Sequence, residues 1–232
     1  MLLSTVAFAQ NAGLSNNDIL AAADAHRGST FGVTWTLNVQ EQGGKSATLS
    51  VQARGDDFLA TYTAPAEQKG QMILQRGLNM WFIKPGIAKP VPISPRQRLL
   101  GAASYGDIAS MRWTNDYRHK RLPDQTNPPA FMFQLTGSSK AAAYDDVTLT
   151  VLKEDLEASK AVVKSTQGQA IKTVTYEYAN RVPGRYASAQ GKPDDASFIS
   201  KSMIAEASGT TTLTYTDINF VQVEPSTFRL TQ

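Results

Sequence analysis

A regular alternation of apolar and polar residues in the first third of the chain constrains its fold most strongly. From Thr30 to Gln40 every second residue is apolar, and the same pattern returns over Ser46 to Ala53 and Phe58 to Tyr62, after glycine-containing turns. A period of two places successive side chains on opposite faces of a β-strand. The intervening residues are mostly threonine, serine and glutamine. We therefore predict an antiparallel meander with one apolar face and one face in water.

The stretch from Gly70 to Tyr117 continues this sheet and then leaves it. Short apolar runs on either side of Gly77 predict a β-hairpin. Four prolines follow between residues 85 and 95, and each removes a backbone donor, so further strand pairing is unfavourable there. Residues 96–111 then carry apolar side chains at a loosely helical spacing. We expect a broken helical lid over the rim of the sheet.

The remaining segments add strands and little helix. Ser15 and Asp18 predict the start of an amphipathic helix that ends near Gly28. Residues 118–129 and 181–195 are polar and are expected to be loops. Further strands are expected at residues 130–136, 147–151, 161–164, 171–178, 197–205 and 210–216.

This order of segments predicts a mainly β protein with a few helices. The strand pattern alone is compatible with a partial barrel and with a sandwich. Because the helical segments gather near the N-terminus and at residues 96–111, a sheet covered by a helical lid is favoured.

Composition excludes several classes of function. The 232 residues contain no cysteine, and a net charge of +3 without a basic block makes nucleic acid a poor partner. His26 and His119 lie in polar surroundings, and the chain has no P-loop, nucleophile elbow or paired-histidine zinc motif. The acidic pairs at 145–146 and 194–195 are typical of turns. We expect no enzymatic activity, no catalytic residues, no metal site and no cofactor.

The first residues contain a pattern typical of secretory processing. Ala7-Phe8-Ala9 precedes Gln10 in an A-x-A pattern typical of secretory cleavage sites. We expect residues 1–9 to be the remnant of a secretory signal and residues 10–232 to form one domain. The alternative is an ordinary N-terminal segment. No run approaches the roughly 20 apolar residues needed to cross a bilayer.

Several of these segments, taken together, resemble a known family. The run MWFIKPG…KPVPISPRQRLLG…YGDIASM…DY, with TAPAEQKGQMIL before it, is similar to the LolA-like outer-membrane lipoprotein-sorting family, in particular the branch often found with membrane transporters. The likeness extends back to residues 19–28 and, more weakly, forward to residues 214–230. The resemblance implies a single large curved antiparallel sheet that forms an unclosed periplasmic β-barrel, or half-barrel, covered by a helical lid. It also implies that this half-barrel holds an acyl chain without catalysis.

From this resemblance we expect certain partners. They are a lipid or acylated lipoprotein as cargo and an inner-membrane transporter or outer-membrane acceptor as docking partner. We expect a monomer. The alternative function is a non-carrier envelope sensor, or an accessory subunit of a membrane transporter, whose apolar face is an ordinary packed core.

The strand pattern and the rim supply the candidate site. The predicted apolar cavity is lined by Val33, Trp35, Leu37, Leu49, Val51, Phe58, Tyr62, Met72, Leu74, Met80, Phe82, Phe131 and Phe133. The predicted lid and rim residues are Arg96, Arg98, Leu99, Leu100, Ile108 and Met111. Arg96 and Arg98 either meet an acidic lipid headgroup or form a solvated edge. The aromatic residues near the rim either contact an acyl chain or fill the core between lid and sheet; they are Trp81, Tyr105, Trp113 and Tyr117.

Overall fold

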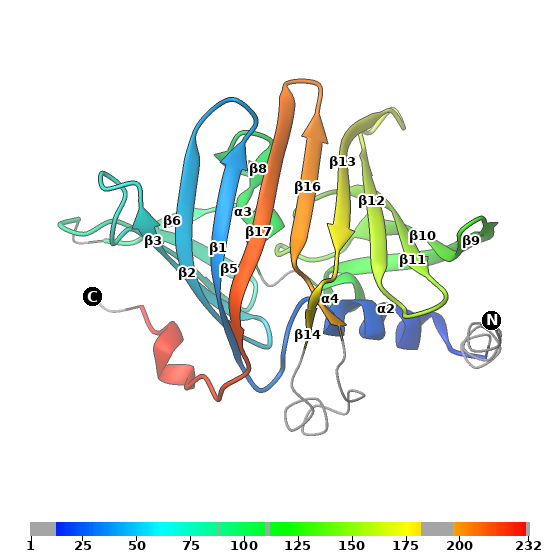
Figure 1. The fold of residues 1–232 in the computed structure, drawn as a ribbon, viewed down its shortest axis with the longest axis horizontal. Helices are drawn as coiled ribbons and strands as arrows, with labels where there is room; N and C mark the ends of the chain where they lie inside the picture. The colour runs from blue at the N-terminus through cyan, green and yellow to red at the C-terminus, as the bar shows by residue number, and fades with distance from the viewer. Residues whose placement is uncertain (1–12, 88, 110–111, 182–196, 231–232) are drawn as a thin grey trace.

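One antiparallel sheet of 13 strands forms the body of the protein (Figure 1). The structure is a computed structural model and describes residues 13–87, 89–109, 112–181 and 197–230. In sheet order the strands are β6 (Val91–Ile93), β5 (Asn79–Ile83), β4 (Met72–Arg76), β3 (Asp57–Ala64), β2 (Ser46–Arg54), β1 (Val33–Glu41), β17 (Gly209–Asn219), β16 (Lys201–Glu206), β13 (Ala170–Glu177), β12 (Ala158–Lys164), β11 (Asp146–Leu152), β10 (Pro129–Gly137) and β9 (Tyr117–Thr126).

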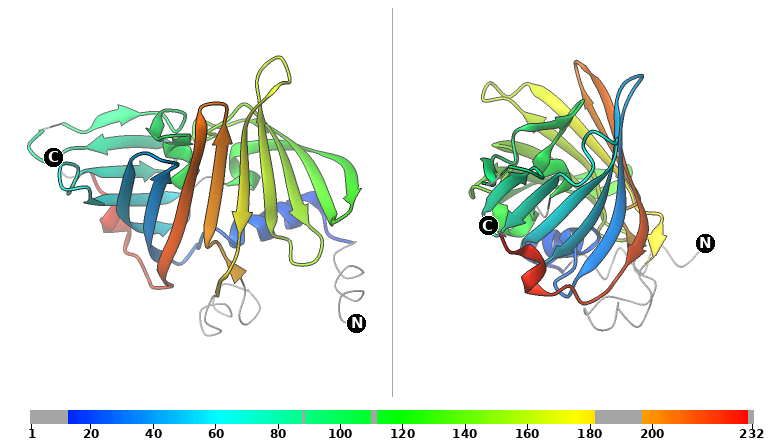
Figure 2. Two further views of the ribbon diagram at one scale, coloured as in Figure 1. Left: turned by 45° about the horizontal axis from the view of Figure 1, so that its top comes forward. Right: turned by 90° about the vertical axis from the view of Figure 1, so that its left-hand side faces the viewer.

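The sheet curls without closing, because β6 and β9 remain its two edges within the described residues. Figure 2 shows the curved sheet with the helices α2 (Asn16–Ala25), α3 (Tyr105–Ile108) and α4 (Trp113–Asp116) on its concave side. The prediction of one curved, unclosed antiparallel sheet is therefore confirmed, and the sandwich is excluded. Two short hairpins stand apart from the large sheet: β7 (Arg98–Leu100) with β8 (Ala103–Ser104), and β14 (Asn180–Arg181) with β15 (Ser197–Phe198).

The meander predicted from the alternation is present as β1, β2 and β3. Trp35 pairs with Val51, which in turn pairs with Ala60, so the three residues share the concave face. All three are buried in the main hydrophobic core. The helix α2 covers this core with Ile19 and Leu20, which lie on its buried side.

Residues 96–109, which we call the cover segment, are less helical than predicted. Arg98, Leu99 and Leu100 form a strand, and Gly101 makes the tight turn to β8 with a φ of 52°. Such a φ favours glycine and ends any helix. The only helix among the described residues of the segment is the single turn α3. The prediction of a broken helix over residues 96–111 was therefore wrong for its first part, because the described segment is a small hairpin followed by one helical turn.

Two other segments were also predicted wrongly, and both are sheet edges. Residues 118–129 were expected to be a loop, but most of them form β9. The proline-rich stretch includes β6, in which Pro92 pairs with Trp81 of β5. A proline is tolerated in an edge strand where its missing N–H faces away from the neighbour. Edge strands also lack a fully buried face, so polar residues do not exclude them.

Met72 and Leu74 lie on the opposite face from the one predicted. Leu74 pairs with Leu59 and packs with Val223 and Phe228 in a second, smaller cluster. The 3-10 helix η1 (Pro225–Phe228) supplies Phe228 and covers this convex part of the sheet. The concave side of β4 is instead formed by Ile73 and Gln75, which pair with Ala60 and Phe58. The assignment of Met72 and Leu74 to the concave cavity was therefore wrong.

Three expectations fall on residues outside the described part of the chain. They are the signal remnant at residues 1–9, the lid residue Met111, and the loop over residues 182–195.

Candidate ligand-binding site

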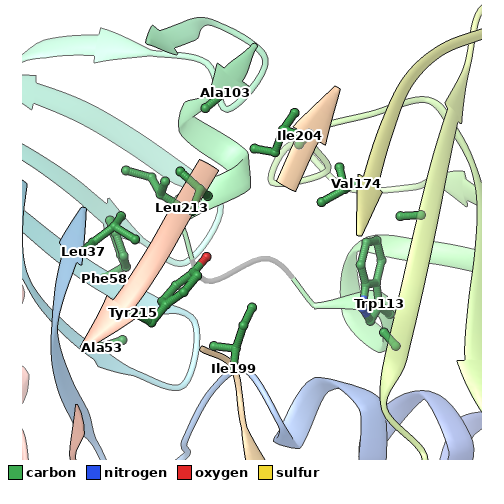
Figure 3. Close-up of a cluster of buried hydrophobic side chains, with 14 of the residues drawn as sticks. Leu37, Ala53, Phe58, Ala103, Trp113, Val174, Ile199, Ile204, Leu213 and Tyr215 are labelled. Atoms are coloured by element: carbon green, nitrogen blue, oxygen red, sulfur yellow. The ribbon is translucent and has the colours of Figure 1, made fainter. Parts of the chain in front are cut away.

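A cavity of about 260 Å³ lies on the concave side of the sheet, beside the C-terminal half of α2. Its apolar wall includes Trp35 of β1, Ala53 of β2, Ile108 of α3 and Ile199. The charged residues in the wall are Asp24, Arg27, Asp107 and Arg112. In Figure 3, Ala53, Tyr215 and Ile199 lie well apart from Trp113 of α4 within this region of the core. The cavity thus has an apolar wall and a small set of charged groups, as small-molecule sites commonly do.

The helix α2 positions the first of these charged groups. Ser15 and Asp18 form a capping box, with the Ser15 hydroxyl accepting the Asp18 N–H at 3.2 Å, which fixes the start of the helix. Near its other end, Asp24 accepts hydrogen bonds from the backbone N–H groups of Trp113 (2.8 Å) and Thr114 (3.1 Å) and from the Thr114 hydroxyl (2.8 Å). Burial raises the pKa of Asp24, although these hydrogen bonds oppose the shift. Asp24 therefore holds the start of α4 against α2.

Arg27 lies two residues beyond the end of α2 and has a different environment. Its guanidinium carbon lies 5.3 Å from the centre of the Trp113 ring and 5.2 Å from that of Tyr176. Its Nε and Nη1 atoms are shielded from solvent and have no hydrogen-bond partner. Trp35 Nε1, in the wall of the same cavity, is likewise buried without a partner.

A buried polar cluster fastens the cover segment to the sheet. Lys172 of β13 lies 3.2 Å from Asp107 of α3 and 3.3 Å from Glu206 of β16. Lys172 also donates a hydrogen bond to the Tyr144 hydroxyl at 2.9 Å, and that hydroxyl donates to Asp107. Asp107 in turn accepts the Ser104 N–H at 2.7 Å and so caps α3. Burial, and then the Asp107 charge, raise the pKa of Tyr144.

The structure places most of the predicted cavity residues in a packed core. The buried members of the predicted set are Val33, Trp35, Leu37, Leu49, Val51, Phe58, Tyr62, Met80, Phe131 and Phe133, and Phe82 is partly buried against them. Only Trp35 of this set lines the cavity of about 260 Å³. The open space is thus smaller than expected and lies nearer to α2. A role in ligand binding for the other residues of the set stays a prediction.

The predicted lid residues are divided between two places. Ile108 lines the cavity. Arg98, Leu99 and Leu100 border a second depression of about 480 Å³ at the other end of the cover segment, next to Glu41 and residues 208–211. Leu99 and Leu100 also pack partly against the core.

Arg96 and Arg98 both form ion pairs with carboxylates of the protein, and a role for them at a lipid headgroup stays a prediction. Arg96 makes a two-pronged ion pair with Asp145, with Nη1 to Oδ2 at 2.8 Å, and Arg98 pairs with Glu206 at 2.9 Å. These contacts fasten the cover segment at its surface. Two cations lie in the wall of the cavity, Arg27 and Arg112, and Arg112 forms an ion pair with Asp56. Neither of them was singled out from the sequence.

The aromatic residues near the rim are also mostly internal. Trp113 and Tyr117 are buried in the main core, their ring centres 5.6 Å apart. Tyr105 packs partly against that core, whereas Trp81 packs in the convex cluster with Leu74.

The described residues contain neither a metal-binding cluster nor a membrane-spanning helix. No group of three or more His, Asp or Glu side chains there is arranged to hold a metal ion. None of the helices in these residues has the length and apolar character to cross a bilayer.

Comparison with solved structures identifies the class of this fold. A LolA superfamily protein from Nitrosomonas europaea superposes with a TM-score of 0.78 at 23% identity, over 94% of this chain and 99% of the other. A domain described as an outer membrane lipoprotein-sorting protein, from Vibrio parahaemolyticus, gives a TM-score of 0.74 at 16% identity, over 91% and 95% of the two chains. A DUF1329 family protein from Desulfovibrio piger gives 0.71 at 14%, over 92% and 95%. The protein therefore has a LolA-like fold.

A match to a protein-family model shows the family of this chain. A family model described as "Uncharacterized protein" matches residues 54–232, and the chain belongs to that family. No curated protein matches the chain.

Proposed function

We propose that this protein is a binding and carrier protein of the bacterial cell envelope that holds the acyl chain of a lipid or lipoprotein. One observation carries the proposal: a LolA-like sheet keeps a partly apolar cavity of about 260 Å³ between its concave face and α2. The periplasm is the compartment that fits such a role. Binding would be non-covalent, without a catalytic step.

The physical need for such a carrier follows from the cost of exposing an alkyl chain. Each CH₂ group buried from water contributes about 0.8 kcal/mol, so a 16-carbon chain costs on the order of 12 kcal/mol in water. A carrier must replace water with its own apolar surface. In this protein Trp35, Ala53 and Ile199 supply that surface at the cavity.

The size of the cavity implies that the cover segment moves when a long chain enters. Ligand pockets commonly measure about 300–1,000 Å³, and the cavity here lies just below that range. Ile108 of the cover segment forms part of its wall. Displacing α3 would therefore enlarge the cavity, at the cost of separating Asp107 from Lys172.

A cavity-filling substitution tests the proposal. Ala25 of α2 lines the cavity, whereas Ala22 of the same helix does not. We expect wild-type protein to bind a fluorophore-labelled fatty acid saturably, and Ala25→Leu to weaken that binding by about tenfold because the added carbons occupy the cavity. Ala22→Leu is the control and should bind like the wild type, with both variants checked for folding by thermal melting. No saturable binding by the wild type, or equal loss in the two variants, would contradict the proposal.

A further inference from the structure

Arg27 is the charged residue of the cavity wall whose interactions within the protein are least complete. Of the other three, Asp24 accepts three hydrogen bonds from α4, Asp107 pairs with Lys172, and Arg112 pairs with Asp56 at 2.9 Å. Among the described residues Arg27 makes no ion pair with a carboxylate, and its Nε and Nη1 atoms donate to nothing.

The aromatic neighbours of Arg27 do not satisfy it fully. The rings of Trp113 and Tyr176 attract the guanidinium charge through their electron-rich faces. A ring face, however, offers no lone pair in the guanidinium plane, where the N–H groups point. An arginine in a protein does not lose its proton, so the charge stays in place. Such a buried cation gains most from an anion that accepts hydrogen bonds in that plane.

A second donor in the wall points to the same ligand chemistry. Trp35 lines the cavity and is only 7% exposed, and its buried indole N–H has no hydrogen-bond partner. An indole N–H can only donate. Arg27 and Trp35 therefore leave unused donors within the wall of a cavity whose carboxylates, Asp24 and Asp107, already accept hydrogen bonds. A ligand group that only accepts hydrogen bonds complements this wall.

We propose that the cavity binds the anionic group of an acyl lipid, a carboxylate or phosphate, and that Arg27 is the cation that recognises it with the Trp35 N–H as a second donor. This inference rests on the proposed function, because the alkyl part of such a ligand needs the apolar wall. The inference adds to the proposed function the chemical class of the lipid headgroup. It assigns recognition of that headgroup to Arg27, just beyond the end of α2, rather than to Arg96 and Arg98 at the rim.

The test compares ligands that share an alkyl chain and differ in charge. Calorimetric titrations of the full chain use decanoate, decanol and inorganic phosphate as probes. We expect Arg27→Met to weaken decanoate binding at least about tenfold and to leave decanol binding unchanged, since only the carboxylate uses the guanidinium. The matched control is Arg76→Met, which removes the same charge from an exposed residue of β4 and should change neither affinity.

The outcomes of these titrations distinguish a failure of this inference from a failure of the proposed function. If Arg27→Met weakens decanoate and decanol equally, or neither, the protein still binds alkyl chains but Arg27 does not recognise the anion. If the wild type binds neither probe, the proposed function fails and the inference falls with it. If inorganic phosphate binds as tightly as decanoate in an Arg27-dependent manner, the site takes a free anion and the lipid assignment is wrong.

A second variant covers the possibility that Arg27→Met does not fold. Trp35→Phe keeps an aromatic ring in the wall and removes only the N–H donor. We expect it to weaken decanoate binding by a few fold without affecting decanol. Unchanged decanoate binding by a folded Trp35→Phe variant would remove Trp35 from the site, and an equal loss for both probes would overturn its role as a headgroup donor.

Discussion

The ammonium group of Lys172 lies 3.2 Å from the carboxylate of Asp107, and the two side chains are only 7% and 5% exposed. Lys172 belongs to β13, an interior strand of the sheet, whereas Asp107 caps the α3 turn of the cover segment. Glu206 of β16 lies 3.3 Å from the same ammonium group. Burial opposes the ionisation of Glu206, but its hydrogen bond from Arg98 and the charge of Lys172 outweigh this and lower its pKa. One buried cation therefore ties the cover segment to two strands.

Removing that cation should destabilise the protein strongly. Lys172→Met leaves Asp107 and Glu206 without their buried partner, and loss of one member of a buried pair costs about 3–5 kcal/mol. We expect the free energy of unfolding, measured by urea denaturation, to fall by that amount. The control is Lys201→Met, which breaks the exposed pair with Glu177 (2.9 Å) and should cost no more than about 1 kcal/mol. Similar small losses in both variants would show that Lys172 does not fasten the cover segment.

Gly106 allows α3 to approach its neighbours closely. A Cβ atom at this position would lie 2.4 Å from the Cβ of Ala143 and 3.1 Å from the carbonyl oxygen of Pro95. Gly106→Ala must therefore push α3 outward, and we expect a loss of about 1–3 kcal/mol in the free energy of unfolding. Gly28→Ala is the control, because the described atom nearest to its added Cβ, the Asp24 carbonyl oxygen, would be 3.9 Å away, and its cost should stay within about 0.5 kcal/mol. Equal stabilities of the two variants in thermal melts would contradict the close packing of α3 against Ala143 and Pro95.

Glu157 should make stability depend on pH near neutrality. Burial raises its pKa to about 7 from 4.5, even though the Ser197 hydroxyl donates a hydrogen bond to its carboxylate. A raised pKa means that the folded protein binds this proton more tightly, so its contribution to stability is complete below pH 4.5 and is lost as pH rises through 7. We expect the unfolding free energy of wild type relative to Glu157→Gln to decline between about pH 5 and 8. A difference that stays constant over this range would mean that Glu157 titrates normally in the folded protein.

The strands that have one buried face and one solvent-exposed face could be predicted from the sequence. In β1 the alternation of Val33, Trp35 and Leu37 with threonines follows directly from this arrangement, because the inward residues pack in the core. The edge strand β9 has no such pattern: half of its residues are exposed, and Arg118 and Lys120 are compatible with a loop. Its pairing with β10 is a contact that local sequence does not record.

The wrong face assigned to β4 has a related cause. Met72, Ile73 and Leu74 are three apolar residues in a row, so a period of two can be started on either face. Both faces are in fact covered, the concave one by the core and the convex one by Phe228 of η1. The covering residue lies more than 150 positions away in the sequence, so no local signal could resolve the ambiguity.

Arg27 could not have been chosen from the sequence alone. Its significance depends on Trp113 and Tyr176, which lie on distant elements and surround the guanidinium only in the folded protein. The two arginines predicted at the rim, Arg96 and Arg98, are paired with carboxylates that also lie far away in the sequence. An apolar concave sheet face was predictable, but the charge inside it was not.

The most direct measurement is to identify any ligand that stays bound to the protein after gentle purification from a cell envelope fraction. Native mass spectrometry, together with analysis of an organic extract, reports whether a ligand is bound and what it is. The account predicts a complex of one acyl lipid per chain, with a mass shift that disappears on extraction. A folded protein that carries no lipid, and that binds none when acyl lipids are added back, would contradict the account.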